Sequence, residues 1–533
     1  MLVKTNLLGS FLIVFFNILS SDIFAKTYDL EIKKQDVFIT GKAVEAITIN
    51  DSIPGPILRF KEGEEAIINV KNSMDEPTSI HWHGLLLDGS MDGVPSLNGF
   101  HGITPDTTFI YRFKIRQAGT YWYHSHSNLQ EQQGVYGALV IEPKKEINKF
   151  DKEFVILLSD FSEENPNVIL NNLKIDSGYY NYNKRTVVTF FKDIKKKGFV
   201  STVKDYWGWG NMRMDPTDLA DVTKYYFLIN GKTTEQNWAG IFKNGERIKL
   251  RFINASAMTI YDISIAEIAS ELNSRRNEGT SYLKMKFVEM DGQLIKPVAA
   301  DEFRIGVAET YDVIIEPKED KIYTIFAESI DRTGYALGTL SPKEGMKGEI
   351  PKMRPRALLT MADMGMNHSN MDHGNMSDMD MSSGWEDRGT PEKNKALEYF
   401  QISSLYPQKD LREPTKEIEF IFGGAMNRYI WTINGEKFPE PFRIKYGERV
   451  RLKFTNQTMM AHPIHLHGMF MQMENGQEMK WMPNKHTVIL PPAQTQTMLL
   501  TANEEGEWAF HCHLLYHMAG GMMTSVTVEK GDK

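Results

Sequence analysis

The chain contains a single cysteine, and a histidine lies on each side of it. Cys512 stands between His511 and His513, and His517 and Met522 follow within ten residues. Because side chains alternate between the two faces of a strand, Cys512 is expected to face one way and its neighbours the other. A thiolate, an imidazole and a thioether, with one more imidazole, form the soft ligand set of a blue-copper electron-transfer centre. This short peptide is therefore predicted to contribute to two metal sites.

The other histidines gather in three further clusters, and these include the candidates for the missing imidazole. Together the four clusters hold ten of the chain's 14 histidines. A lone pair of histidines separated by one residue can be an incidental feature of a strand face, but four clusters, the last with a cysteine, indicate metal ligation. The three upstream clusters are His81 with His83, His124 with His126, and His462 with His465 and His467.

A repeated block predicts the architecture. Residues 63–72, 245–254 and 447–456 each begin with Gly-Glu and end with Asn, and an Ile-Asn pair precedes each block. Apolar and polar residues roughly alternate within a block, as in a half-buried strand that follows a glycine turn. We therefore predict three related β domains at 26–147 (first repeat), 148–345 (second repeat, with an insertion at about 165–223) and 401–533 (third repeat), with a Met-rich linker at 346–400.

The repeats can be compared position by position. Nine residues beyond the closing Asn lie His81 in the first repeat and His465 in the third, but Ile263 in the second. The second repeat contains no histidine or cysteine, so its role is expected to be structural. The positions that correspond to His462, Cys512 and His517 of the third repeat are Thr78, Ser125 and Gln130 in the first. The complete blue-copper set is thus predicted in the third repeat only, with a multinuclear copper cluster between the first and the third.

The N-terminus is typical of a secretory signal peptide. Lys4 precedes an apolar run at 7–19, and a stretch ending at Ala25 follows, so residues 1–25 are expected to be removed. The run is shorter than the ~20 residues that span a bilayer, and no second run of spanning length follows it. These features predict a periplasmic protein, exported by a Sec-type signal, whose mature chain has no membrane span.

Charge and cysteine content narrow the function further. The net charge of -8 argues against nucleic acid as a partner. One cysteine cannot form an internal disulfide, and copper ligation explains an unpaired thiol in an oxidising compartment.

At these motifs the chain resembles the multicopper oxidases, and among them the periplasmic copper-resistance (CopA-type) branch. The resemblance covers the whole mature chain and is strongest at 79–84, 119–137, 216–221, 331–336, 459–463 and 506–522. It implies an all-β fold of three cupredoxin-like β-sandwich domains. It also implies four copper ions, one of type 1, one of type 2 and two of type 3.

The resemblance assigns ligands to these ions. The type 1 ligands would be His462, Cys512, His517 and Met522. The type 2 ligands would be His81 and His465, and the type 3 ligands His83, His124, His126, His467, His511 and His513. Two catalytic roles are implied, electron transfer through Cys512 and proton delivery by Asp92. Met518 and Ala519 stand where related cuprous oxidases have acidic residues, which leaves a second proton route unassigned.

Methionines suggest the substrate. Thioether sulfur is a soft ligand that favours Cu(I). Met460, two residues before the type 1 histidine motif, is expected to contact substrate copper, whereas the other methionines around 459–473 are expected to fill the core. In the linker, the candidate ligands are Met361, Met364, Met366, His368, Met371 and His373. The leftover histidines, His101 and His486, are expected to be surface or structural residues.

The leading interpretation is an oxidase of metal ions, with Cu(I) or Fe(II) as reductant and dioxygen as the acceptor that is reduced to water by four electrons. It would serve copper resistance. Two alternatives remain. A laccase-like oxidase would take electrons from phenols and should have an open, apolar approach to His462. A periplasmic copper-sequestering protein would act through the Met-rich segment and not depend on turnover.

Overall fold

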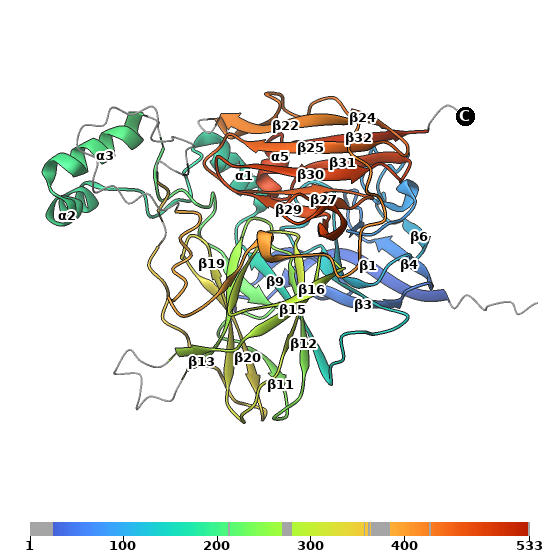
Figure 1. The fold of residues 1–533 in the computed structure, drawn as a ribbon, viewed down its shortest axis with the longest axis horizontal. Helices are drawn as coiled ribbons and strands as arrows, with labels where there is room; N and C mark the ends of the chain where they lie inside the picture. The colour runs from blue at the N-terminus through green and yellow to red at the C-terminus, as the bar shows by residue number, and fades with distance from the viewer. Residues whose placement is uncertain are drawn as a thin grey trace, which may run out of the picture.

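The computed structural model of the protein describes residues 25–211, 214–268, 280–356, 358–360, 363, 384–425 and 428–530. Strands dominate these residues and form six sheets, two in each repeat (Figure 1). The predicted all-β fold is therefore confirmed. The strands of the first repeat, in blue, lie beside those of the third, in red, and the strands of the second repeat, in green and yellow, extend below the third in this view (Figure 1).

The first repeat has two four-stranded sheets. One has the order β2-β1-β4-β6 and the other β3-β8-β7-β5. The strands are β1 (Ala25–Val37), β2 (Val44–Ile49), β3 (Gly55–Lys61), β4 (Glu65–Asn72), β5 (His81–His83), β6 (Thr108–Lys114), β7 (Gly119–His124) and β8 (Tyr136–Glu142).

The second repeat has the sheets β10-β9-β12-β18-β15-β16 and β11-β20-β19-β13-β17-β21, with β14 paired to β13. The strands of the first of these sheets are β9 (Lys152–Phe161), β10 (Tyr226–Ile229), β12 (Ile248–Asn254), β15 (Met285–Met290), β16 (Gln293–Ala300) and β18 (Thr310–Ile315). Those of the second are β11 (Trp238–Ile241), β13 (Tyr261–Ile268), β14 (Thr280–Tyr282), β17 (Glu302–Ile305), β19 (Tyr323–Ser329), β20 (Tyr335–Ser341) and β21 (Ala396–Leu397). The last of these, β21, comes from the linker and extends the sheet of the second repeat.

The third repeat has the sheets β23-β22-β25-β30-β27-β28 and β24-β32-β31-β26-β29. The strands of the first are β22 (Lys416–Ala425), β23 (Ile430–Ile433), β25 (Arg449–Asn456), β27 (Met471–Met473), β28 (Asn484–Lys485) and β30 (Thr495–Thr501). Those of the second are β24 (Phe442–Lys445), β26 (His462–Leu466), β29 (Thr487–Leu490), β31 (Gly506–Cys512) and β32 (Met523–Glu529).

The repeated block plays the same structural part in each repeat. It forms β4, β12 and β25, and its closing residues Asn72, Asn254 and Asn456 are all buried. Each of these side chains donates to two or more backbone carbonyls and accepts a backbone N–H two residues later. Because a buried amide must be hydrogen-bonded, this one residue fixes the loop that leads to the next strand. In the third repeat the loop ends at His462.

Helices occupy the insertion in the second repeat. They are α1 (Pro166–Ile175), α2 (Val187–Lys197) and α3 (Phe199–Asn211), and a further short helix, α5 (Leu515–Gly520), follows β31. The α2 and α3 helices project from the sheets (Figure 1). In the part of the chain that the structure describes, no helix is long and apolar enough to cross a membrane.

Candidate metal centres

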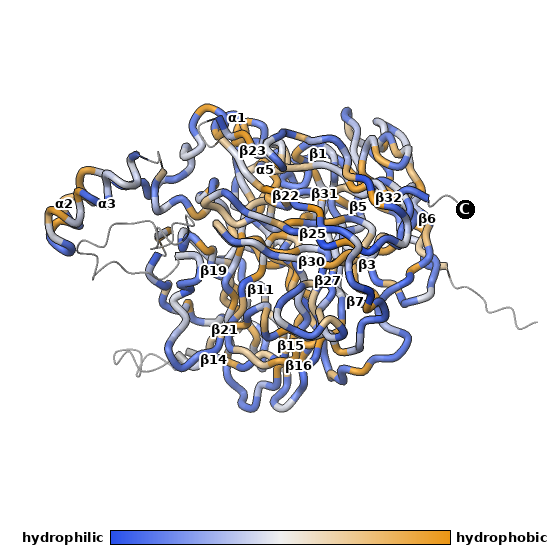
Figure 2. Tube along the Cα trace, turned by 45° about the horizontal axis from the view of Figure 1, so that its top comes forward, coloured by the Kyte–Doolittle hydropathy of each residue, from blue (hydrophilic) through white to orange (hydrophobic). Residues whose placement is uncertain are grey.

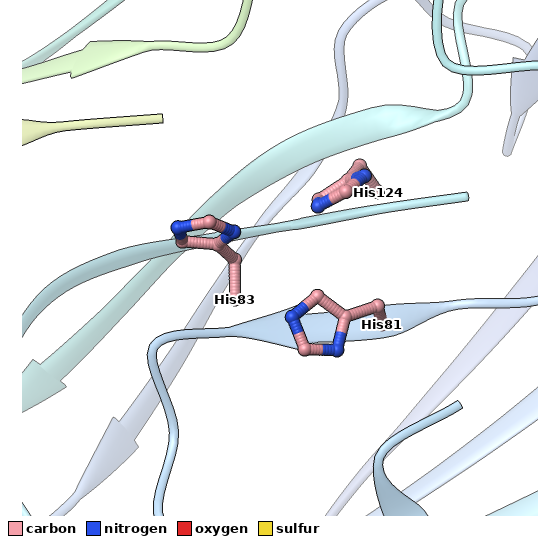
Figure 3. Close-up of side chains that lie close together, drawn as sticks. All are labelled: His81, His83 and His124. Carbon is pink, nitrogen blue, oxygen red and sulfur yellow. The ribbon is translucent and has the colours of Figure 1, made fainter. Parts of the chain in front are cut away.

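Four strands carry the paired histidines to one place. In the first repeat β5 pairs with β7, which sets His81 opposite His124, and in the third β26 pairs with β31, which sets His465 opposite His511. Figure 3 shows His81 and His83 of β5 close to His124 of β7. Each pair of strands therefore brings its imidazoles together where the first and third repeats meet.

The imidazoles of the two repeats interlock. The rings of His81 and His467 stack with their centroids 3.8 Å apart, and those of His83 and His465 stack at the same distance. His126 of the first repeat brings its Nε2 atom to 3.3 Å from Nε2 of His511. The structure thus gathers all eight rings that the sequence predicted for a multinuclear site. They form the eight-histidine cluster, which consists of His81, His83, His124, His126, His465, His467, His511 and His513.

The hydrogen bonds of these rings point their lone pairs inward. His81 Nδ1 lies 2.8 Å from the backbone oxygen of Asp92, and His124 Nδ1 lies 2.8 Å from a carboxylate oxygen of Glu131. A nitrogen beside such an acceptor carries the proton, so the other nitrogen of the neutral ring carries a lone pair. The buried nitrogens without a hydrogen-bond partner are His81 Nε2, His83 Nδ1, His124 Nε2, His465 Nε2 and His513 Nε2. Buried polar atoms need partners, and a cation is the partner that several converging lone pairs fit.

A second observation leads to the same result. His467 Nδ1 donates to Asp92 Oδ2 at 2.9 Å, and His511 Nδ1 donates to the backbone oxygen of Cys512 at 2.9 Å. In the neutral rings both Nε2 atoms then carry lone pairs, yet they face each other at 3.1 Å. Since two lone pairs repel at this distance, the geometry fits rings that share a site for metal ions.

Burial keeps the rings ready to bind a metal. Desolvation, with the neighbouring imidazoles, lowers the pKa of seven of these eight histidines, so these seven are neutral at pH 7. Neutral imidazole is the form that ligates metal ions. The pKa is about 4 for His511, and it is well below the usual value for His83, His124, His126, His465, His467 and His513.

The cysteine lies on the opposite face of β31, in a second site. Cys512 Sγ is 3.6 Å from Nδ1 of His462 and 3.8 Å from Nδ1 of His517, and these two nitrogens are 3.1 Å apart. Met522 is fully buried, and its backbone N–H donates to the carbonyl of His517. Burial raises the pKa of the Cys512 thiol, so a thiolate at neutral pH requires a bound cation. An N₂S set of two imidazoles and a thiolate fits copper.

The first repeat replaces this second site with hydrogen bonds. Thr78 and Ser125 both donate to the side-chain oxygen of Gln130, at 2.7 and 3.0 Å, and all three side chains are buried. These are the three residues that the repeat alignment set against the cysteine site. In the second repeat Ile260, six residues past Asn254 as His462 is past Asn456, is buried in apolar surroundings. The first and second repeats therefore fill the position of the cysteine site differently, the first with hydrogen-bonded polar side chains and the second with an apolar one.

Asp92 lies between the two repeats. It is 1% exposed, and its backbone and side-chain oxygens reach His81 and His467 respectively, as described above. One aspartate therefore fixes the orientation of a ring from each repeat. Its carboxylate is also in contact with the cluster, where the resemblance to the multicopper oxidases implies a proton donor.

Sequence reasoning missed a hydroxyl that touches the eight-histidine cluster. Thr487 Oγ1 is 3.2 Å from His83 Nε2, 3.1 Å from His465 Nδ1 and 3.0 Å from His486 Nδ1. His486 is 1% exposed, which excludes a surface position for it, and its ring centroid is 4.7 Å from that of His83. The other leftover histidine, His101, is exposed as expected. No local pattern in the sequence sets His486 apart from a surface histidine.

Sequence reasoning also missed a carboxylate at the cysteine site. Asp221 Oδ2 accepts from His517 Nε2 at 2.8 Å and from the Tyr429 hydroxyl at 2.6 Å. Asp218, three residues earlier in the chain, is also buried, and each carboxylate has one oxygen without a hydrogen bond. Burial raises the pKa of Asp221 to about 7, and burial together with the charge of Asp221 raises that of Asp218 to about 8. In the sequence, only the family resemblance draws attention to residues 216–221.

The methionines divide between described and undescribed parts of the chain. Met459, Met460 and Met469 are each 2% exposed, and all three belong to the large apolar core that joins the second and third repeats. The backbone oxygen of Met460 accepts from the Asn456 side chain, which fixes the backbone two residues before His462. The linker candidates Met361, Met364, Met366, His368, Met371 and His373 lie outside the described residues.

Comparison with known proteins gives consistent matches along the chain. Family models described as multicopper oxidase match residues 31–146, 281–345 and 412–532. The chain is 43% identical to copper resistance protein A of Escherichia coli, over 94% of this chain and 92% of that protein. It is 44% identical, with the same coverage, to a copper resistance protein A homolog of Pseudomonas syringae pv. tomato.

Solved structures match at the level of the fold. The crystal structure of Fet3p, a multicopper oxidase that functions in iron import, has a TM-score of 0.69 at 18% identity, and the match covers 95% of this chain and 91% of that one. A multicopper oxidase from Campylobacter jejuni, described as a metallo-oxidase, has a TM-score of 0.62 at 21% identity. Both matches extend over all three repeats.

Proposed function

Because the chain belongs to the multicopper oxidases, we propose that it oxidises metal ions, Cu(I) or Fe(II), and reduces dioxygen to water. In this reaction four metal ions each lose one electron, and one dioxygen takes up the four electrons with four protons to give two waters. The likeness to copper resistance protein A supports a role in copper resistance. The signal-like sequence at 1–25 supports action in the periplasm.

Copper is the cofactor of this family, and we assign four ions to this chain. His462, Cys512, His517 and Met522 would hold the type 1 ion. The type 2 ion would be held by His81 and His465, and the type 3 pair by His83, His124, His126, His467, His511 and His513. The unpartnered ring nitrogens and the N₂S geometry support this assignment.

Bound at these positions, copper supplies one-electron redox chemistry and binds dioxygen. The protein residues provide the electron path, the proton donor and the exclusion of water. Cys512 is joined through the backbone to His511 and His513, so the type 1 site has a covalent path to the eight-histidine cluster. Asp92 holds two of the cluster's rings and is placed to deliver a proton. Since both sites are buried, bulk water is excluded from them.

The observation that favours a metal ion as reductant is the acidic surroundings of His517. Asp221 is bonded directly to the Nε2 edge of this ring, and Asp218 is buried close by. Each of these buried carboxyl groups has a free oxygen, and a bound cation would favour the ionised form against the burial that raises their pKa. A metal ion held there would lie one hydrogen bond from a type 1 ligand.

The laccase-like alternative finds less support. An oxidase of phenols was expected to have an open approach to His462, but His462 and His517 are both fully buried. The Nε2 edge of His462 is covered by the Thr458 hydroxyl at 2.7 Å. Bulky aromatic reductants therefore have no exposed ring edge to contact among the described residues.

The test compares oxygen uptake by the copper-loaded protein with Cu(I), Fe(II) and a dimethoxyphenol. Asp218→Asn is expected to lower kcat/KM for the metal ions at least tenfold and to leave the phenol rate unchanged, because Asp218 has no contact with a type 1 ligand. Asp301→Asn is the matched control, since Asp301 is also buried but contacts Lys284 and the backbone of residue 395. An equal loss for all three reductants would contradict a metal-binding role for Asp218.

Deleting residues 364–383 separates oxidation from sequestration. Asp363 accepts the backbone N–H of Gly384 at 2.8 Å, so the two ends of this segment are already joined and the deletion should be tolerated. An oxidase keeps its four coppers and changes mainly in its preference among reductants. A sequestering protein loses most of its bound Cu(I) and its protective effect.

A further inference from the structure

The insertion in the second repeat carries a helical hairpin that the oxidase chemistry does not use. The helices α2 and α3 are joined at Gly198, whose φ of +83° suits a glycine. They pack through Phe190 and Tyr206, with ring centroids 5.0 Å apart, and the Tyr206 hydroxyl donates to Asp193 at 3.0 Å. Buried Trp209 anchors the end of α3 in the main core. The hairpin is thus folded and attached, yet it stands away from the sheets (Figure 1).

The outer surface of this hairpin is apolar. Along α3 the apolar residues follow the spacing of one helix face, and along α2 they form a second exposed group. The hairpin contributes seven of the 23 large apolar side chains that are exposed in the described residues, although it spans only 187–211. They are Val187 (72% exposed), Val188 (64%), Phe191 (60%), Phe199 (64%), Val200 (78%), Val203 (37%) and Trp207 (71%). A concentration of this kind marks an interaction surface.

The hairpin is also basic, in contrast to the chain as a whole. Residues 184–207 contain seven lysines and arginines against two aspartates, whereas the whole chain has a net charge of -8. Both aspartates are engaged within the hairpin region, since Asp205 pairs with Arg185 at 2.9 Å and Asp193 accepts from Tyr206. Five exposed lysines have no ion pair with any described residue. They are Lys192, Lys195, Lys196, Lys197 and Lys204.

We propose that α2 and α3 dock the protein on the surface of an anionic lipid bilayer. Exposed aliphatic and aromatic side chains beside unpaired lysines are what interfacial amphipathic helices use, because the apolar residues enter the headgroup region while the lysines meet the lipid phosphates. Figure 2 shows apolar and polar segments alternating along both helices. Since no described helix is long enough to span a bilayer, this contact lies in the plane of the membrane.

The charge of the hairpin favours an anionic bilayer over a second copy of the chain as its binding partner. If two hairpins packed against each other through their apolar faces, ten unpaired lysines would be brought together without a described acidic partner. Like charges that approach on desolvation destabilise such an interface. An anionic bilayer supplies both the counter-charge and the apolar phase. Proximity to a membrane would hold the oxidase where metal ions cross, but the docking surface does not depend on the proposed function.

The experiment measures co-sedimentation of the full copper-loaded protein with vesicles. One set is phosphatidylcholine alone, and the other contains phosphatidylglycerol. Two variants are compared, Phe191→Ser with Trp207→Ser, and Lys195→Glu with Lys196→Glu and Lys197→Glu. Each has a matched control elsewhere on the surface: Phe38→Ser with Phe438→Ser for the first, and Lys318→Glu with Lys343→Glu and Lys393→Glu for the second.

The wild-type protein and both controls are expected to bind the anionic vesicles and not the neutral ones. Each hairpin variant is expected to lose at least tenfold in partitioning while its oxidase rate in solution stays unchanged. Three results would overturn the proposal. They are no binding to anionic vesicles, binding that the hairpin variants do not alter, and a hairpin-dependent dimer in analytical ultracentrifugation without vesicle binding.

Discussion

Replacing Thr487 by valine tests the metal-site geometry with the smallest change that the structure allows. Valine has the shape of threonine without the hydroxyl. That hydroxyl lies between three rings. One assignment of the protons satisfies its hydrogen bonds: His83 Nε2 donates to Thr487 Oγ1, and the Thr487 hydroxyl donates to His486 Nδ1. His83 Nδ1 is then left with an inward lone pair. His465 also has the backbone oxygen of His486 at 2.8 Å and keeps that bond in the variant.

The magnitude follows from this count of hydrogen bonds. Among the histidines of the cluster, only His83 loses a hydrogen-bond acceptor in Thr487→Val. A buried donor left without a partner costs about 1–3 kcal/mol. If this cost falls on the metal-bound state, copper affinity at the eight-histidine cluster decreases by roughly 5- to 150-fold, because each ~1.4 kcal/mol is a factor of ten. Loss of a partner behind a ligating histidine costs metal affinity by similar factors, about 10–100-fold.

The assay is competition with a copper chelator of known affinity. Copper per chain reports the cluster, and the colour of the Cys512 site reports the second site independently. Thr487→Val should lose copper from the cluster at lower chelator concentrations while the colour persists, whereas Thr487→Ser, which keeps the hydroxyl, should behave like the wild type. If the serine and valine variants were equally weak, or if the valine variant held copper normally, the hydrogen-bond assignment would be wrong.

Three other substitutions probe separate parts of the molecule. Cys512→Ser should abolish the intense thiolate-to-copper absorption and steady-state turnover with the fold retained, as absorption and circular dichroism would show. Gly84→Ala places a Cβ 2.5 Å from a carbon of the His486 ring at a φ of +82°, so cluster copper should fall in metal analysis while the colour remains. Burial raises the pKa of Asp262, but Arg304, Arg332 and Arg354 more than offset this and hold it well below its usual value. Its stabilisation is therefore present above pH ~4, the unfolded pKa, and is lost as pH falls further. Asp262→Asn should cost about 3–5 kcal/mol at pH 7 and less at pH 3, measured by calorimetry.

Much of the candidate site could be predicted from the sequence because its ligands come from short, regular segments. Alternation along one strand is enough to separate Cys512 from His511 and His513, and the structure places them on opposite faces of β31. The repeat alignment also predicted which residues of the first repeat stand in place of the cysteine site. Thr78 and Gln130 contact each other at the position where the third repeat has His462 and His517. In such cases the backbone geometry of one element decides the result.

The residues that surround the ligands could not be predicted in this way. Asp221 reaches His517 across 296 positions of sequence, and Thr487 reaches His83 across 404. No periodicity links such positions, because the contacts arise only when separate sheets pack together. A buried histidine such as His486 likewise has the same local pattern as a surface one until its neighbours are in place.

The second repeat shows what these long-range contacts add. It has no histidine or cysteine, yet it places a carboxylate beside both sites: Asp221 at His517, and Asp291, which accepts the Thr487 backbone N–H at 3.3 Å and pairs with Lys485 at 3.0 Å. Lys485 is fully buried and also pairs with Glu309 of the second repeat at 2.7 Å. Breaking a buried ion pair of this kind is costly, so the segment that carries Thr487 is held firmly against the eight-histidine cluster. The second repeat, although it has no histidine or cysteine, therefore contributes to both candidate metal centres, because it positions residues of the third repeat there.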